Sequence, residues 1–308
     1  MPFFIAMACP SQYLSPMPLV PRLPASFPGK NFSFLQLAAL ALLLPVMCTG
    51  CADLSAVAKF AASAKVASSG FGDIAKDFAG SAKRRSLYVR EKEKPKALEQ
   101  AETYKALEPD MMAAQKLLVD YIAALGAISS DSTKSRDASV GATEPGLERI
   151  GMKPGQASAG VGLAAKLVDA ATARYRSNKA GSTIHDANPL LQDYLKGLEQ
   201  IAGTDYPAVL EDERISAEGY YDGLLHEYGE KEPLAAVAIR IDRQHDLEAI
   251  ADKKKAARAY TKILTDIGEA HQKLYDQGKH MSAKQMGTIV EPYLADIAIE
   301  SVKVAKAY

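Results

Sequence analysis

The chain has 308 residues, enough for one large domain or two small ones, and its 48% hydrophobic and 24% charged content is ordinary for a globular protein. Its 37 basic and 37 acidic side chains cancel, so no overall field favours binding to nucleic acid. The charges are distributed unevenly, because residues 1–50 contain no Asp or Glu and only Arg22 and Lys30 as basic residues. This change of composition near residue 50 is the clearest boundary in the sequence.

The most apolar stretch runs from Phe34 to Cys48. At about fifteen residues it is shorter than the roughly 20 that a membrane-spanning helix needs. It has the length of the apolar core of a secretory signal peptide, follows two basic residues, and is itself followed by the small residues Thr49 and Gly50. The pattern therefore predicts a removable signal peptide over residues 1–50.

The end of this stretch resembles the lipobox of bacterial lipoproteins, in which small residues precede a cysteine that becomes acylated. Thr49 and Gly50 match the small positions and Cys51 matches the modified one, whereas Cys48 stands where an aliphatic residue is usual. The resemblance implies cleavage between Gly50 and Cys51, acylation of Cys51, and attachment to a lipid bilayer on its periplasmic side. Ala52 directly after Cys51 implies the outer rather than the inner membrane.

Other interpretations of the two cysteines remain open. Plain secretion or an N-terminal membrane anchor would use the same apolar stretch. A Cys-x-x-Cys redox pair would need a βαβ setting, and a metal site would need further Cys or His residues at ligand spacing, which do not follow. The sequence favours the lipoprotein interpretation, with Cys51 as the single cysteine of the mature chain.

Beyond residue 51, apolar residues recur every three or four positions, and neither strand-like alternation nor an Asn-Gly hairpin signal appears. The pattern predicts an all-α protein, an elongated up-and-down bundle in which residues 232–275 form one long helix of roughly 65 Å. Residues 51–95 are expected to form a lipid-anchored, small-residue-rich helical segment, and residues 96–308 the bundle. Residues 129–160, rich in Ser, Gly and Pro, predict a flexible loop. The predicted helices cover residues 54–85, 96–128, 163–175, 188–201, 205–228, 232–275 and 282–304.

His245 is the most conspicuous polar residue, because it lies on the apolar stripe predicted for residues 232–275. It is also the one histidine with a carboxylate three residues upstream, Asp242, which makes half of the pair that a di-iron bundle requires twice. We consider three arrangements: a buried polar cluster that binds a ligand, a hydrogen-bonded polar layer, and a helix that turns its stripe outward.

Five tyrosines gather over a short part of the sequence and are candidates for a groove that binds a peptide or glycan; the alternative is packing between adjacent helices. They are Tyr194, Tyr206, Tyr220, Tyr221 and Tyr228. No G-x-S-x-G elbow, P-loop or second zincin histidine accompanies them. The sequence therefore predicts neither an enzyme nor a cofactor or metal site.

The resulting functional hypothesis is a membrane-anchored lipoprotein that acts as a non-enzymatic binding or scaffold protein of the cell envelope. Its partners would be the lipid bilayer, through acylated Cys51, and an envelope protein, with no role for nucleic acid. Two alternatives are an inhibitor or immunity-type protein against an envelope-acting toxin, and a helical bundle that binds a ligand or metal. Self-association through the long helix is a further alternative.

Overall fold

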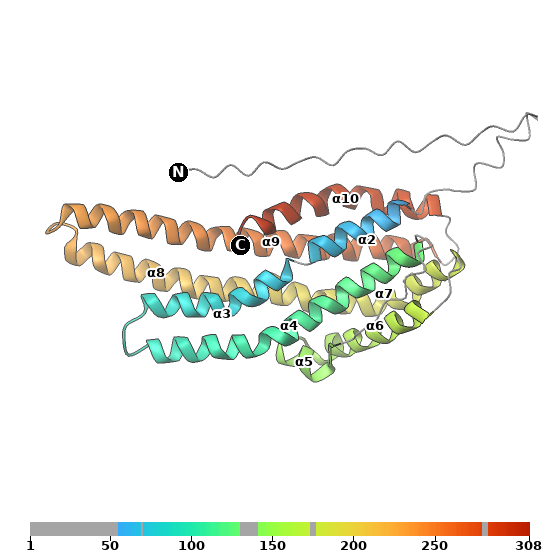
Figure 1. Cartoon of the computed structure of the whole chain (residues 1–308), viewed down its shortest axis with the longest axis horizontal. Coiled ribbons are helices and arrows are strands. Elements are labelled where there is room, and N and C mark those ends of the chain that lie inside the picture. Colours follow the sequence, from blue (N-terminus) through green and yellow to red (C-terminus); the bar gives the residue numbers. More distant parts are fainter. Residues whose placement is uncertain (1–54, 69, 130–140, 173–176, 279–282) are drawn as a thin grey trace, which may run out of the picture. The chain divides into compact units, whose positions relative to one another are not determined.

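The computed structural model describes residues 55–68, 70–129, 141–172, 177–278 and 283–308 (Figure 1). The described residues all belong to one compact unit, which lies within Ala52–Tyr308. Helices account for nearly all of the described residues and no strand occurs among them, which confirms the all-α prediction. The elements are α2 (Ser55–Ser68), α3 (Phe71–Tyr88), α4 (Lys94–Ser129), α5 (Glu144–Arg149), α6 (Pro154–Thr172), α7 (Ser177–Gln200), η2 (Ile201–Asp205), α8 (Tyr206–Tyr228), α9 (Pro233–Asp276) and α10 (Ala283–Ala305).

The bundle is built from helices that run antiparallel to their neighbours, as Figure 1 shows for α3 with α4, α8 with α9 and α9 with α10. The long helix predicted for residues 232–275 is α9, which has 44 residues. Pro233 begins it, where the missing N–H costs nothing, and Gly278, with a φ of 85°, follows its end. The periodic pattern therefore predicted both ends of this helix to within one residue.

Residues 55–88 belong to the bundle rather than to a separate anchor segment. Helix α2 packs against α4 and α10, and α3 packs against α4 and α8. Phe71, Ile74 and Phe78 of α3 lie in the hydrophobic core with at most 3% of their surface exposed. The predicted boundary near residue 95 is the turn between α3 and α4 and not the edge of a domain.

The loop predicted over residues 129–160 is wrong for its second part, whereas residues 130–140 lie outside the described residues. Residues 144–149 form α5, because the Thr143 hydroxyl accepts a hydrogen bond from the Gly146 amide at 3.2 Å and caps the first turn. Leu147, Ile150 and Met152 are buried and attach this short helix to the core. The prolines of this segment, Pro145 and Pro154, lie in the first turns of α5 and α6 and do not mark a loop.

The break predicted between residues 201 and 205 is also absent. Helices α7 and α8 continue into each other through η2, a π-helical turn whose flanking residues Gln200 and Tyr206 keep helical dihedral angles. Pro207 has no N–H to donate to the preceding turn, and the wider π turn accommodates this without ending the helix. Burial of Ile201 and Tyr206, both 0% exposed, holds the turn in the bundle.

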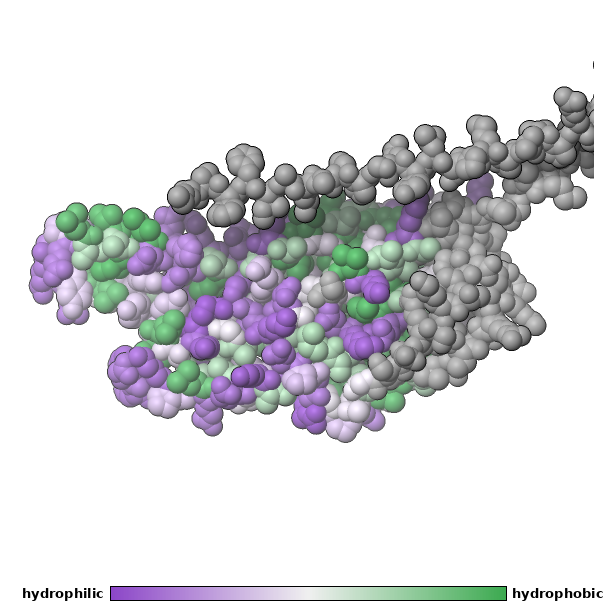
Figure 2. Space-filling model, viewed as in Figure 1, coloured by the Kyte–Doolittle hydropathy of each residue, from purple (hydrophilic) through white to green (hydrophobic). Residues whose placement is uncertain are grey.

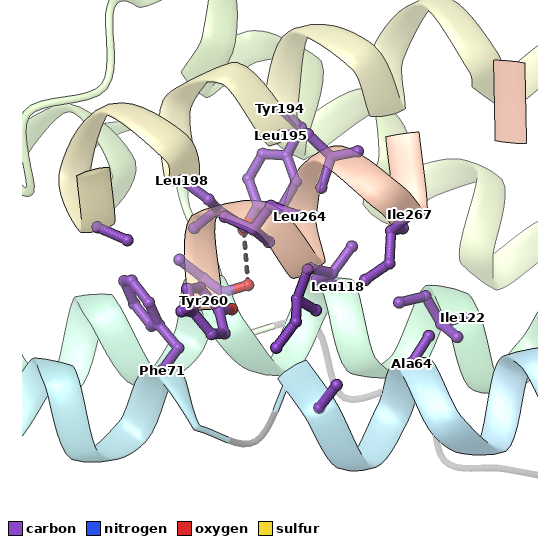
Figure 3. Close-up of a cluster of buried hydrophobic side chains, with 14 of the residues drawn as sticks. Ala64, Phe71, Leu118, Ile122, Tyr194, Leu195, Leu198, Tyr260, Leu264 and Ile267 are labelled. Carbon is purple, nitrogen blue, oxygen red and sulfur yellow. Dashed lines mark hydrogen bonds between the residues drawn. The ribbon is translucent and has the colours of Figure 1, made fainter. Parts of the chain in front are cut away.

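The core lies where α2, α3, α4, α7 and α9 meet (Figure 3). The side chains drawn there come from all of these helices and include Leu118, Leu198 and Leu264, each fully buried. Tyr194 takes part through its ring, and its hydroxyl donates a hydrogen bond of 2.6 Å to the Ala114 carbonyl, drawn as a dashed line. The core is therefore aliphatic and aromatic, and of the two buried tyrosines labelled there the hydroxyl of Tyr194 is bonded to the backbone, whereas that of Tyr260 has no hydrogen-bond partner among the described residues.

Candidate functional site

His245 and Asp242 do not form a buried site. The His245 side chain is 83% exposed and Asp242 is exposed as well, because both lie on faces of α9 that point away from the core. The side of this part of α9 that faces α8 instead carries Ala236, Leu247 and Ile250. Of the arrangements considered from the sequence, the outward-turned stripe is the one found. Among the residues that the structure describes, no three His, Cys, Asp or Glu side chains are grouped to hold a metal ion.

The five candidate tyrosines do not line one groove. Tyr194 and Tyr206 are fully buried and make separate internal hydrogen bonds, to the Ala114 carbonyl and to the Asp77 carboxylate. The rings of Tyr220 and Tyr221 pack edge to face with a centroid distance of 5.3 Å, while Tyr228 is the last residue of α8. Packing between adjacent helices, the alternative considered from the sequence, describes four of the five.

Tyr220 and Tyr221 form a surface cluster with Tyr88 of α3, which the sequence did not single out. The ring centroid of Tyr88 lies 5.9 Å from that of Tyr220 and 6.0 Å from that of Tyr221. The hydroxyls of Tyr88 and Tyr221 both donate to Asp246 Oδ2 of α9, at 2.7 and 2.6 Å. Burial raises the pKa of Asp246, but these two donors outweigh it and hold the pKa below its usual value. The cluster therefore joins three helices around one carboxylate.

A second polar cluster lies deeper, between α3, α8 and α9. The Arg84 guanidinium contacts Asp77 Oδ1 at 2.8 Å and Glu213 Oε1 at 2.6 Å, so that one cation joins two carboxylates. Lys253 of α9 adds a 2.7 Å ion pair with Asp77, and Ser81 donates to Glu213 at 2.6 Å. With two cations and two anions, the cluster is neutral as a whole.

Neutrality explains why these charges are tolerated where Glu213 is 1% and Asp77 8% exposed. Burial alone raises the pKa of Asp77, but hydrogen bonds and charges from Arg84 and Lys253 outweigh it and lower the pKa. The Tyr206 hydroxyl donates to Asp77 Oδ2 at 2.7 Å, which completes the shell. Every charged group is bonded to another within the cluster, so the arrangement fixes helix positions and presents no reactive group.

His271 of α9 is the histidine that the structure buries, with 2% exposed. Its Nδ1 lies 2.8 Å from Asn188 Oδ1, and its Nε2 lies 2.7 Å from the Tyr121 hydroxyl. Because Asn188 Oδ1 is an acceptor, Nδ1 carries the proton and Nε2 accepts from Tyr121. Burial lowers the pKa of His271 to about 3, so the ring is neutral at pH 7.

The spacing of charged residues did not single out His271, because Gly268 and not a carboxylate stands three residues upstream of it. Its two partners come from α4 and α7, at separations of 150 and 83 residues along the chain. No local motif marks such a layer. Gln192 and Gln272 extend it, because Gln192 donates a hydrogen bond to Asn188 and Asn188 donates one to Gln272. The layer is a hydrogen-bonded junction of three helices.

An apolar stripe on the first part of α9 faces away from the bundle. Leu234 is 88%, Val237 51% and Ile241 62% exposed. Their spacing of three and four residues places them on one helix face, opposite the side that packs on α8. Figure 2 shows hydrophobic surface gathered at this end of the α8–α9 hairpin.

An open groove of about 600 Å³ lies beside this stripe, between α8 and α9. Its lining is mixed in charge and includes Arg240, Arg243 and Glu248. The Arg243 Nε lies 3.4 Å from Asp222 Oδ1, so the groove is partly closed by an ion pair of its own. It contains neither a histidine nor a hydroxyl nucleophile.

The predicted lipidation site, Gly50 and Cys51, lies outside the described residues. Among the helices that the structure describes, none combines the length and the apolar character needed to cross a membrane. A comparison of the chain with protein-family models found no match. Comparisons with curated proteins and with solved structures likewise found no significant similarity.

Proposed function

We propose that the protein is a bacterial lipoprotein, anchored through acylated Cys51 to the periplasmic face of a membrane, and that its helical bundle is a non-enzymatic binding protein of the cell envelope. The lipobox-like residues Thr49, Gly50 and Cys51 support the anchor. The observation that carries the binding role is the exposed stripe of Leu234, Val237 and Ile241 on α9. Exposed large apolar residues that share one helix face are typical of an interaction surface, whereas single ones are not.

The polar residues of the bundle support the same proposal. Those with shifted pKa values, such as Asp77 and His271, are engaged in internal hydrogen bonds between helices. Groups held in this way stabilise the position of the helices and are not directed at a substrate. The bundle therefore serves as a rigid support for the surface that it presents.

The start of α2 and the stripe lie at opposite ends of the bundle (Figure 1). The first half of α2 lies against the end of α4, because Gly126 of α4 is so close to Ala61 that a Cβ on it would lie 2.6 Å from the Ala61 side chain. The stripe follows the turn between α8 and α9, at the other end of the bundle (Figure 1). Since Cys51 precedes α2 by only a few residues, acylation there would hold the bundle by the α2 end. Two or more acyl chains give stable anchoring, where a single chain gives marginal binding.

Fractionation of bacteria that produce the tagged full-length chain, or the same chain with Cys51→Ser, tests the anchor. We expect the wild-type chain to gain the mass of its acyl chains, to lose residues 1–50 and to sediment with membranes. Cys51→Ser should remain unacylated and uncleaved between Gly50 and the substituted position. Equal mass and equal cleavage of the two proteins would remove the lipoprotein proposal.

A further inference from the structure

The outer face of α9 continues beyond the stripe into a part of the bundle where a helix already covers it. The face that carries Leu234 and Ile241 continues along α9 at the helical period of 3.6 residues. Further along, the same face carries Ala259, Ile263 and Ala270, which are at most 4% exposed. Helix α10 packs along this half of α9: Lys273 lies 5.0 Å above the Tyr293 ring, and Lys253 lies 5.9 Å from the Tyr308 ring. The apolar face therefore accepts a helix in its C-terminal half.

In the N-terminal half of α9, the described residues provide no such cover. Leu234, Val237 and Ile241 continue the line of the α10 site but remain exposed. His245 and Glu248 separate the two parts of the face with polar side chains. Because the face is continuous with an established helix–helix contact, the shape that it fits is a second helix lying along it. Three apolar anchors at this spacing are typical of sites that bind an amphipathic helix.

The charge of this end of the hairpin indicates which helix it would bind. Residues 222–248 contain seven Asp or Glu and three Lys or Arg. Asp222, Glu227, Glu230, Glu232 and Asp242 are all exposed. A partner with basic residues beside its apolar face would meet these carboxylates, whereas an acidic partner would be repelled. The same acidic surroundings oppose binding to an anionic lipid surface or to an identical acidic hairpin end.

We propose that Leu234, Val237 and Ile241 form the docking site for an amphipathic helix of a partner protein whose apolar face is flanked by Lys or Arg. This deepens the proposed binding function and rests on it, but it does not depend on the anchor. The partner helix lies along the outer face of α9, in the line that α10 occupies further along, with its cations against the carboxylates of the hairpin end.

Two designed helical peptides of the same length test the proposal, one with Leu at its heptad core positions and Lys beside them, the other with Glu in place of Lys. Each carries a fluorophore, and its anisotropy is measured against the purified full-length protein in a mild non-ionic detergent, with or without acylation of Cys51. We expect the Lys peptide to bind at least tenfold more tightly than the Glu peptide. The preference should shrink as NaCl is raised from 50 to 500 mM, because salt screens the exposed charges.

The double variant Leu234→Ser, Ile241→Ser should weaken binding of the Lys peptide at least tenfold. Its matched control is Ile299→Ser, Val302→Ser on α10, where the side chains are 55% and 54% exposed but lie on another helix. The control should bind like the wild type. Because all four positions are exposed, both variants should keep the circular dichroism spectrum and thermal midpoint of the parent.

Three outcomes overturn the proposal. Failure of both peptides to bind, or equal binding by the two variants, removes the docking site. A dimer, measured by light scattering, that Leu234→Ser, Ile241→Ser dissociates assigns the stripe to a second copy of this chain. Loss by that variant of binding to anionic phosphatidylglycerol vesicles assigns it to lipid. None of these affects the acylation of Cys51, so failure of the docking site and failure of the anchor are distinguishable.

Discussion

The two halves of α9 have similar apolar periodicity and opposite surroundings. From Ala256 to Leu274 most of the helix surface is buried, and Ile263, Leu264 and Ile267 all have at most 1% of their surface exposed, while charged residues such as Lys262 and Glu269 form one exposed face. From Pro233 to Ala249 it packs mainly on α8, and its outer face is open. The difference teaches that an apolar stripe specifies a face for contact without specifying whether the contact is made within the chain.

Polar residues differ between the two regions in the same way. Next to the covered half, charges are bonded into closed groups, such as Arg84 with Asp77 and Glu213. In the open half, His245 and Asp242 extend into solvent. The covered half should therefore carry most of the stability, and the open half should tolerate substitution.

The largest difference in the free energy of unfolding is expected between two arginine variants. Arg84→Met leaves Asp77 and Glu213 buried with only Lys253 to balance them, and the free energy of unfolding should fall by about 3–5 kcal/mol. Arg240→Met on the exposed surface should change it by less than about 0.5 kcal/mol. Urea unfolding followed by circular dichroism measures both. Equal values would show that the cluster does not stabilise the covered region.

The next difference concerns isoleucine on the same face of α9. Ile263→Ala, at a position with 0% exposure, should cost about 2–4 kcal/mol through lost burial and the cavity that remains. Ile241→Ala, at 62% exposure, should cost less than about 0.5 kcal/mol. The comparison uses the same urea measurement. A large effect at Ile241 in the isolated protein would mean that the stripe is covered in solution, contrary to the docking proposal.

Histidine should give a pH-dependent difference. The pKa of His271 is about 3 in the folded state and about 6.5 when unfolded, so between these values the unfolded chain binds more protons. Stability should therefore fall as pH drops from 6.5 toward 4, by about 1.4 kcal/mol per pH unit from this group. His271→Gln should flatten the dependence, and His245→Gln should not. The measurement is the midpoint of urea unfolding at several pH values. A pH dependence of this midpoint that His271→Gln leaves unchanged would contradict a buried, neutral His271 ring.

The smallest difference is expected among the tyrosines on α8. Tyr221→Phe removes a hydrogen bond of 2.6 Å to Asp246 and should cost about 1 kcal/mol. Tyr220→Phe, at a side chain 40% exposed, should cost less than about 0.5 kcal/mol. Unfolding by urea distinguishes them. Identical costs would indicate that Tyr88 alone holds the Asp246 carboxylate.

Sequence reasoning succeeded where the signal was local. The periodicity of residues 232–275, together with Pro233 and Gly278, predicted α9 because helix formation depends on residues within a few turns. It failed at residues 144–160, where Pro and Gly belong to helix ends, and at residues 201–205, where the chain forms a π turn in place of a break. In both places, contacts made by Ile150 or Tyr206 elsewhere in the bundle overrode the local signal.

The candidate site shows the same limit more strongly. His245 was selected because spacing along the helix placed it among Leu234 and Ile241, and those residues do share its face. Spacing could not show that this face is open. Conversely, His271 gained its buried layer from Tyr121 and Asn188, which are far away along the chain.

The sequence by itself determined that the chain beyond residue 51 is helical and where its longest helix begins and ends. Only the tertiary structure decided which part of the α9 stripe became core and which became surface. The reason is that amphipathicity is a property of one helix, whereas burial depends on whether another helix lies across it. Here α10 and α2 cover one half of α9, and the outer face of the other half stays exposed.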